Sequence, residues 1–177
     1  MKGGIAVAAL LALLTLASCG ADTSSAPLPR GFRRYQDQGR GFVIALPSGW
    51  RKTMEDAQGV NFTDRDRDLL LEIGDQPSGA DGLDAATGQM VTELTGGGPG
   101  NTVTVTEATL SGYPARRIQA EVPTKGGNSN VEAVVTVHDG VIWSVALTGL
   151  KTSVQQAQGS FDQVTQSFQV STSGSGT

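Results

Sequence analysis

The chain contains one histidine, and an acid follows it directly. His138 precedes Asp139, and serines stand at Ser111 and Ser144, so these residue types could form a Ser-His-Asp hydrolase site. A triad needs its acid to orient the imidazole from across a site. Asp139-Gly140 is instead typical of a two-residue hairpin turn, where we expect neighbouring side chains to point apart. No Gly-x-Ser-x-Gly motif accompanies the serines. We therefore predict no catalytic residues.

Asp64–Asp68, with the sequence DRDRD, places three carboxylates at alternate positions, as a calcium-binding loop does. Asp75 even falls at the twelfth position of such a loop. However, Leu69 replaces the glycine required at the sixth position, and the last ligand would be Asp where a bidentate Glu is needed. The two arginines between the carboxylates also neutralise them. We predict a solvated hairpin turn here and no metal site.

Three further features are better explained by structure than by chemistry. Gly96–Gly100, with the sequence GGGPG, lacks the Gly-Lys-Ser/Thr ending of a phosphate loop and follows a predicted helix, so it reads as a connector. Trp50 and Trp143 are expected to pack in the core. The pairs Arg33-Arg34 and Arg116-Arg117 are expected to be solvated. We predict no cofactor site.

The single cysteine stands where its thiol has a defined use. Lys2 supplies a positive charge, and Ile5–Leu16 is an apolar run that, at about 1.5 Å per residue, is too short to cross a hydrocarbon core of about 30 Å. This pattern is typical of a secretory signal peptide. Leu16-Ala17-Ser18-Cys19 resembles the lipobox of bacterial lipoprotein precursors. The resemblance implies that Cys19 becomes the N-terminus and carries a diacylglyceryl thioether, whose two acyl chains anchor the protein. Whether the Cys19 amine is also acylated, for example with palmitate, is left open.

The composition excludes some partners. The formal net charge is −4, and it becomes −5 once the signal peptide with Lys2 is removed. An acidic domain has no electrostatic reason to bind nucleic acid. Hydrophobic residues make up 38% of the chain, which is enough for one globular domain. The many Ala and Gly residues, and an excess of Arg over Lys, are common in GC-rich actinobacteria.

The chain divides into four parts. Residues 1–18 are the predicted lipoprotein signal peptide. Residues 19–30, with their small, polar and proline residues, form a lipidated flexible tether that reaches roughly 20 Å. Residues 31–170 form one folded domain, and residues 171–177 form a disordered tail.

Hairpins dominate the folded part. Ser111-Gly112 and Asp139-Gly140 are two-residue turns, and each separates a pair of apolar runs. Alternating valines in the last pair put Val131, Ala133, Val135 and Val137 on one face of their strand, and Val141, Trp143, Val145 and Leu147 on one face of the next. The predicted strands are Phe42–Leu46, Val60–Thr63, Leu69–Ile73, Val103–Leu110, Tyr113–Glu121, Val131–His138 and Val141–Thr148.

Two segments have helical spacing. In the first, Leu83, Ala86, Met90, Val91 and Leu94 share one face, and Gly96–Gly98 ends the helix. In the second, the apolar residues are Val154, Ala157, Phe161, Val164 and Phe168. The predicted fold class is therefore α+β, with amphipathic helices packed on a mostly antiparallel sheet built from hairpins.

Several segments occur in a recognisable order. They are GFVIALPSGW (41–50), GVNFTD (59–64), LSGYPARR (110–117), VHDGVIWSVAL (137–147) and a final helix ending in SF (167–168). Together they resemble the PsbP-like sandwich family, especially the actinobacterial secreted lipoproteins of the LpqN/LpqT type, over nearly all of residues 35–169. The resemblance implies an α/β/α sandwich and a role in binding or assembly, and it supplies no catalytic signature.

These observations favour a non-enzymatic lipoprotein, anchored by lipid to the outer face of the cell membrane, that binds or assembles an envelope protein partner. One alternative is a small-molecule or lipid carrier, with an apolar pocket between sheet and helices lined by residues such as Met90, Leu94 and Phe161. A less favoured alternative is a cell-envelope hydrolase that uses scattered acids such as Glu72 and Glu132.

Overall fold

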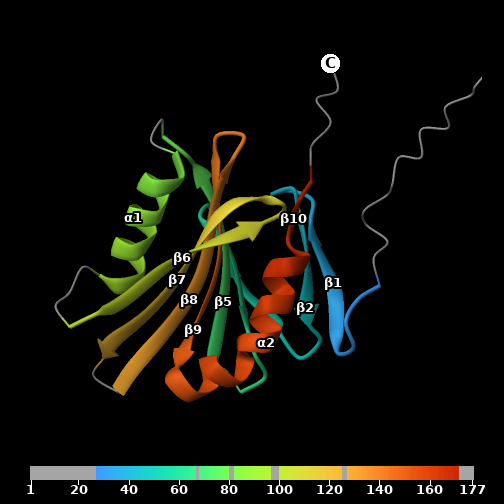
Figure 1. Ribbon diagram of the computed structural model, residues 1–177. Coiled ribbons are helices and arrows are strands. Elements are labelled where there is room, and N and C mark those ends of the chain that lie inside the picture. Colours follow the sequence, from blue (N-terminus) through green and yellow to red (C-terminus); the bar gives the residue numbers. More distant parts are fainter. Residues whose placement is uncertain (1–26, 67, 80–81, 97–99, 125–126, 172–177) are drawn as a thin grey trace, which may run out of the picture.

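The computed structural model describes residues 27–66, 68–79, 82–96, 100–124 and 127–171 (Figure 1). Ten strands and two helices follow one another in this part of the chain. In order they are β1 (Phe32–Asp37), β2 (Phe42–Pro47), β3 (Arg51–Glu55), β4 (Gly59–Thr63), β5 (Leu69–Pro77), α1 (Gly82–Thr95), β6 (Thr102–Leu110), β7 (Tyr113–Thr124), β8 (Gly127–His138), β9 (Val141–Leu150), α2 (Lys151–Ser167) and β10 (Gln169–Val170).

The strands form two antiparallel sheets. The larger sheet has seven strands in the order β3-β4-β5-β9-β8-β7-β6, and the smaller has three in the order β1-β2-β10. Every predicted strand is present, and most extend a few residues beyond the predicted bounds. The α+β prediction is confirmed, and the small sheet is an addition to it.

Local turn chemistry explains two of the hairpins. Ser111 and Gly112 have φ of 55° and 80°, and Asp139 and Gly140 have φ of 50° and 73°. Two successive positive φ values are the signature of a primed turn, whose twist matches that of the flanking strands. The turns set the registers Leu110↔Tyr113 and His138↔Val141, so both predicted hairpins are confirmed.

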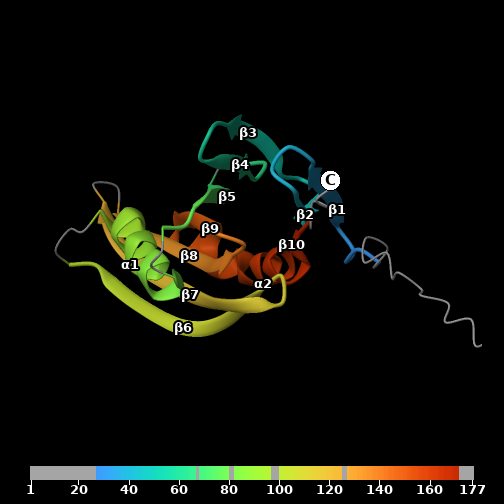
Figure 2. The same cartoon turned by 90° about the horizontal axis from the view of Figure 1, so that it is seen from above.

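The helices cover opposite faces of the large sheet (Figures 1 and 2). Helix α1 packs on β7 and β8, and α2 packs on β8, β9 and the small-sheet strand β2. Helix α1 ends at Thr95, and Gly96 follows with φ 62°, the left-handed conformation that commonly terminates a helix. Both predicted helices are confirmed, and the layers are α1, the large sheet, and then α2 with the small sheet.

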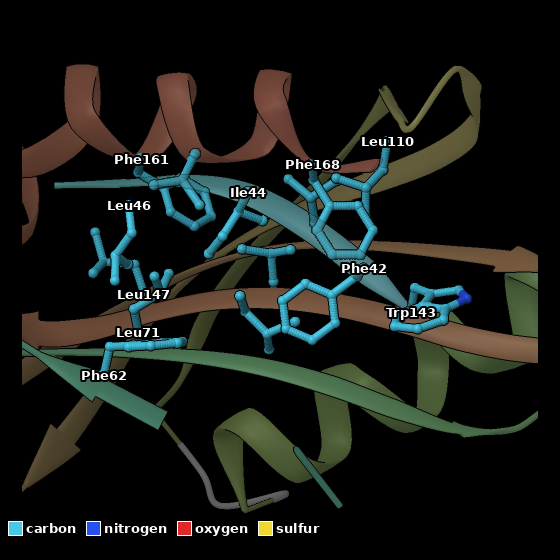
Figure 3. Close-up of a cluster of buried hydrophobic side chains, with 14 of the residues drawn as sticks. Phe42, Ile44, Leu46, Phe62, Leu71, Leu110, Trp143, Leu147, Phe161 and Phe168 are labelled. Carbon is cyan, nitrogen blue, oxygen red and sulfur yellow. The ribbon is translucent and has the colours of Figure 1, made fainter. Parts of the chain in front are cut away.

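The main core lies between the large sheet and the layer made by α2 and β2 (Figure 3). Phe42 stacks on Phe168 with ring centroids 5.8 Å apart. The Trp143 ring contacts both of these rings. The fully buried side chains there include Phe42, Ile44, Leu46, Phe62, Leu71, Leu110, Leu147, Phe161 and Phe168. A second, smaller core lies under α1 and contains Ala86, Met90, Ile118, Ala133, Val135, Ile142 and Ala146.

The two apolar faces predicted for β8 and β9 point to opposite sides of the sheet. In the register of this hairpin Val134 lies opposite Val145, while Ala133 lies opposite Ala146. Trp143 and Val145 therefore face α2, whereas Ala133 and Val135 face α1. Both faces of these two strands are buried in their central parts, which explains the consecutive apolar residues at Ala133–Val135 and Val145–Leu147.

Three strands, β1, β3 and the two-residue β10, are not predicted from the sequence. β1 and β3 carry mostly polar side chains, and all five residues of β3 are exposed. Strand β3 is an edge of the large sheet, so one side of it has no strand to pair with. Between β2 and β3 the chain turns at Pro47–Trp50, where the Trp50 amide donates to the Pro47 carbonyl at 3.0 Å.

Candidate functional site

Strand β6 is an open edge of the large sheet. It is nine residues long, and seven of its side chains are threonines, valines or alanine that are exposed or half-buried. Its one charged residue is Glu107. Val105 is 43% exposed. An edge strand presents unpaired backbone N–H and C=O groups along its free side, which can pair with another extended chain. β6 is therefore a surface that could accept an added strand.

The opposite edge of the same sheet is different. β3 carries Arg51, Lys52 and Glu55, and its pairing with β4 shifts register between Lys52 and Met54. Charged side chains and bulges are the features by which natural proteins prevent edge-to-edge pairing. The Lys52 ammonium also lies 2.5 Å from the Glu55 carboxylate along this edge. The large sheet thus has one protected edge and one unprotected edge.

Two hollows lie beside β6, between the β6–β7 hairpin and α2; together we call them the α2 groove. Their volumes are about 260 Å³ and about 530 Å³. The lining is mainly polar, and side-chain amides are prominent in it. The lining residues include Thr102, Thr104, Gln119, Asn130, Glu132, Gln155 and Gln158 in the first hollow, and Ser111, Arg117, Asp162, Thr165, Gln166 and Gln169 in the second.

Arg117 crosses this groove and joins the sheet to the helix. Its Nε donates to Glu132 Oε1 on β8 at 2.7 Å, and its Nη2 donates to Asp162 Oδ1 on α2 at 2.7 Å. Its guanidinium carbon also lies 5.7 Å from the centre of the Phe161 ring. Burial alone would lower the pKa of Arg117, but the hydrogen bonds to Asp162 and Glu132 outweigh it and raise that pKa. The guanidinium is a fixed cross-link, and its charge is already balanced.

Apart from Glu107 and from Glu121, which pairs with Lys151, the rest of the α2 groove offers mainly neutral hydrogen-bonding groups. The Glu132 carboxylate also accepts from Gln119 Nε2 at 3.2 Å, so this buried acid is satisfied. The Oδ1 atom of Asn130 is buried and lacks a hydrogen-bond donor among the described residues, and it borders the smaller hollow. A buried amide oxygen is normally paired, so this atom favours a donor that enters from the groove. The surface suits an uncharged polar chain.

Of the residues that suggested a hydrolase, His138 and Asp139 contact each other, and neither serine hydrogen-bonds to them. His138 ends β8 and stacks on Tyr113, with ring centroids 3.7 Å apart. Contrary to our expectation, Asp139 does not point away, because its Oδ2 lies 3.1 Å from His138 Nε2. The serines lie elsewhere: the Ser111 hydroxyl accepts from the Val170 amide at 3.0 Å. Ser144 is in the middle of β9 opposite Val135, three residues from the strand's hairpin end.

Asp64 belongs to the turn between β4 and β5. Asp64 Oδ1 accepts from the Leu69 amide at 3.2 Å and so closes the β4–β5 turn, as expected for a structural role. Within the described residues, no three His, Cys, Asp or Glu side chains gather closely enough to hold a metal ion. The middle of Gly96–Gly100 lies outside the described residues.

The tryptophan and arginine predictions have different outcomes. Trp143 is 4% exposed in the main core, and Trp50 packs against that core while half-buried. Arg116 pairs with an exposed Asp84 at 3.2 Å, which fits a solvated residue. The prediction for its neighbour Arg117 is wrong, because that side chain is one quarter exposed and bridges two carboxylates.

The apolar pocket imagined for a carrier is not formed by the predicted residues. Met90 and Leu94 lie on α1, whereas Phe161 lies on α2 and therefore on the other face of the sheet. The space bordered by Phe161 is only about 10 Å³, which is about the room for one water molecule. Of the scattered acids, Glu132 is engaged by Arg117, and Glu72 lies near α1.

The predicted lipidation site, Cys19, lies outside the described residues, as do the predicted signal peptide and the last six residues of the chain. Among the described residues there is no helix long and apolar enough to cross a membrane. The anchoring of the protein through Cys19 stays a prediction.

No family model and no curated protein matches the chain, but solved structures do. The cyanobacterial PsbP protein CyanoP of Synechocystis sp. PCC 6803 aligns with a TM-score of 0.60 at 20% identity, over 88% of this chain and 98% of CyanoP. A protein of Bacteroides thetaiotaomicron aligns with a TM-score of 0.60 at 12% identity, over 81% of this chain and 50% of its own. LpqN of Mycobacterium tuberculosis, described as involved in cell envelope biogenesis, aligns with a TM-score of 0.46 at 14% identity, over 82% of this chain and 81% of LpqN, and we draw no functional conclusion from it. The chain therefore has the PsbP-like α+β fold, in which helices pack on antiparallel sheets.

Proposed function

We propose that the protein is a lipid-anchored extracytoplasmic lipoprotein that serves as a non-enzymatic binding or assembly module at the cell envelope. We further propose that an extended segment of a partner protein docks on the β6 edge. The observation that carries this proposal is the contrast between the unprotected β6 edge and the protected β3 edge of one sheet.

Strand addition at β6 would draw on two sets of contacts. Main-chain hydrogen bonds to the free side of β6 supply affinity without regard to sequence. On the α2 face, Thr102 and Thr104 border the groove, so alternate side chains of the added strand would extend toward its amides. Because the groove's one guanidinium is already paired, this surface favours uncharged polar side chains on the partner.

The lipid anchor is supported by the sequence. Leu16-Ala17-Ser18-Cys19 fits the lipobox pattern at the end of an apolar run, and two acyl chains hold a protein durably at a membrane. The short tether keeps the domain within roughly 20 Å of the bilayer, which favours partners in or near the membrane.

The non-enzymatic part of the proposal is supported by how the reactive side chains are used. The imidazole of His138 is stacked on Tyr113 and faces Asp139, and Ser111 accepts a backbone hydrogen bond. Acid–base catalysis needs such a group within hydrogen-bond reach of a substrate in a site. Here His138, Asp139 and Ser111 make contacts within the protein at the ends of two hairpins.

The docking proposal is tested by charging each edge in turn. Val105 on β6 and Met54 on β3 are both exposed apolar side chains, 43% and 52%, so Val105→Lys and Met54→Lys form a matched pair. A photo-crosslinking residue at Thr104 should form an adduct with a partner in native membranes. We expect Val105→Lys to reduce that adduct about tenfold and Met54→Lys to leave it unchanged. An equal loss in both variants, or no adduct at Thr104, would contradict docking on β6.

The anchor is tested separately. Mature protein from native membranes should carry the mass of a diacylglyceryl group on Cys19, and the mass also reveals whether the amine is acylated. Cys19→Ala should leave the protein extractable without detergent. A mature chain without lipid mass, or a Cys19→Ala variant that stays membrane-bound, would rule out this anchor and leave the docking proposal standing.

A further inference from the structure

We propose that a hollow beside α1 binds an organic cation, namely an ammonium or guanidinium group carried on an aliphatic chain. The hollow has a volume of about 450 Å³ and lies between α1 and the β5–β9 part of the large sheet; we call it the α1 hollow. Its lining includes Glu72, Gln76, Met90, Glu93, Leu94 and Ser144. It is on the opposite face of the sheet from the α2 groove, so the proposal is independent of docking on β6.

The fold brings these residues together from three elements. Helix α1 packs over β7 and β8 and leaves the neighbouring β5 and β9 less covered on that face (Figure 2). Gly74 of β5 lies opposite Ser144 of β9 in the ladder, and Glu72 faces the same side two residues before Gly74. Met90, Glu93 and Leu94 supply the helical wall.

Two exposed carboxylates that line the α1 hollow have no cationic partner among the described residues. Glu72 makes no hydrogen bond or ion pair with any described residue, and Glu93 accepts only from Gln89 Nε2, at 2.8 Å. A third acid at the rim, Asp75, is already paired with Arg40. The remaining negative charge is therefore unbalanced among the described residues. Burial raises the pKa of Glu72, and repulsion from Asp56 and Glu93 adds to the increase, in agreement with that imbalance.

The hydroxyl of Ser144 is a second, independent indication of a ligand. The residue is 8% exposed and lines the hollow, yet its hydroxyl has no hydrogen-bond partner among the described residues. The residue is almost fully enclosed, but the hydroxyl oxygen itself opens onto the hollow. Gly74 keeps this hydroxyl open to the hollow, because a Cβ atom at Gly74 would lie 2.7 Å from Ser144 Oγ. A donor entering the hollow could pair with this oxygen.

The shape and lining favour an organic cation over a metal ion. The described residues include no cluster of three His, Cys, Asp or Glu side chains able to hold a metal. Met90 and Ala146 are 7% and 6% exposed, and with Leu94 they form an apolar wall that suits methylene groups. A volume of this size is in the range of small-molecule sites. The same chemistry could come from a free diamine or from a lysine or arginine side chain of a polypeptide.

Methionine methyl NMR of the full-length protein in non-ionic detergent tests the proposal. Besides the initiator, the chain has only Met90, in the hollow, and Met54, on the far edge strand β3. We expect 1,5-diaminopentane to shift the Met90 methyl signal saturably with Kd in the millimolar range and to leave Met54 unmoved. The neutral analogue 1,5-pentanediol should shift neither signal.

Variants identify the groups responsible. Glu72→Gln/Glu93→Gln should weaken diamine binding about tenfold or more, and Ser144→Ala should weaken it severalfold. Asp66→Asn removes an exposed carboxylate in the β4–β5 turn, outside the hollow, and should leave binding unchanged. Circular dichroism of each variant checks that the fold is retained.

Two ligands, a lysine-containing tetrapeptide and the free diamine, distinguish the possible sources of the cation. If a tetrapeptide with one central lysine also saturates the Met90 shift, the hollow accepts a polypeptide side chain; if only the diamine does, it takes a free amine. Either result supports the proposal. It is overturned if Met90 does not shift with the diamine, if pentanediol shifts it equally, or if the Glu72→Gln/Glu93→Gln variant binds as tightly as the parent.

Discussion

Arg117 of β7 and Asp162 of α2 are 45 residues apart in the chain, yet the arginine Nη2 lies 2.7 Å from the aspartate Oδ1. The same guanidinium holds the carboxylate of Glu132, whose side chain is 4% exposed. These contacts attach α2 to the β6–β7 side of the large sheet, at the border of the main core, where the guanidinium also lies over the Phe161 ring. The cross-link should therefore be important for stability.

The first prediction concerns this cross-link. Arg117→Leu leaves Glu132 buried without its cation, so we expect a loss of about 3 kcal/mol in the free energy of unfolding, measured by urea denaturation. Arg116→Leu is the control, because the partner of Arg116 is 88% exposed and its loss should cost less than about 1 kcal/mol. Arg117→Leu/Glu132→Leu should recover much of the loss. Equal effects of the two single variants would refute the interpretation.

The second prediction concerns pH. The pKa of Glu72 is raised in the folded protein, so Glu72 ionises more readily in the unfolded chain and lowers stability at neutral pH. This penalty disappears as the pH falls through the raised pKa to below the ordinary value of 4.5. Glu72→Gln should therefore raise Tm at about pH 7 and leave it unchanged near pH 3.5. Asp66→Asn, which removes an exposed charge, should show no such pH-dependent difference.

The third prediction compares two glycines. A Cβ atom at Gly149 would lie 2.5 Å from the Asp68 carbonyl oxygen and 2.8 Å from a Leu69 methyl carbon. Gly149→Ala should therefore cost about 2 kcal/mol of stability, since the backbone of β5 must shift. At Gly159 in α2 nothing lies within 4 Å, and Gly159→Ala should add about 1 kcal/mol through helix propensity. Chemical denaturation should thus give shifts of opposite sign.

The fourth prediction concerns the end of α2. The Ser167 hydroxyl accepts from the Ala45 amide at 2.8 Å and donates to the Val164 carbonyl at 2.8 Å, which ties the helix to β2. Ser167→Ala leaves a buried amide unpaired, so we expect a loss of about 1–2 kcal/mol and faster hydrogen exchange at Ala45. Ser160→Ala, in the same helix, should not destabilise, because no hydrogen bond with a described residue is lost. Unchanged exchange at Ala45 would contradict this role.

Features that depend on neighbouring residues could be predicted from the sequence. Asp139-Gly140 and Ser111-Gly112 demand positive φ at successive positions, so the two hairpins and their registers follow from local chemistry. The apolar spacing of α2 likewise reveals its buried face. Strand β3 gave no signal, since an exposed edge strand has no buried face to impose alternation.

The candidate sites depend on pairing across long separations, which sequence patterns do not reveal. Arg117 appeared to be one half of a solvated basic pair, because its neutralising partners come from another strand and a helix. Met90 and Phe161 appeared to share a pocket, because periodicity shows that a helix has an apolar face but not which face of the sheet it covers. The exposed state of β6 became visible only from the strand order.

The unequal edges of the large sheet also limit stoichiometry. A sheet with two free edges could extend indefinitely, with each added molecule offering a fresh edge to the next. Here the far edge is charged and contains a register shift, so a copy of this chain joined through β6 would present no second site of the same kind. If two copies associate through β6, we therefore expect them to stop at a pair and not to form a filament.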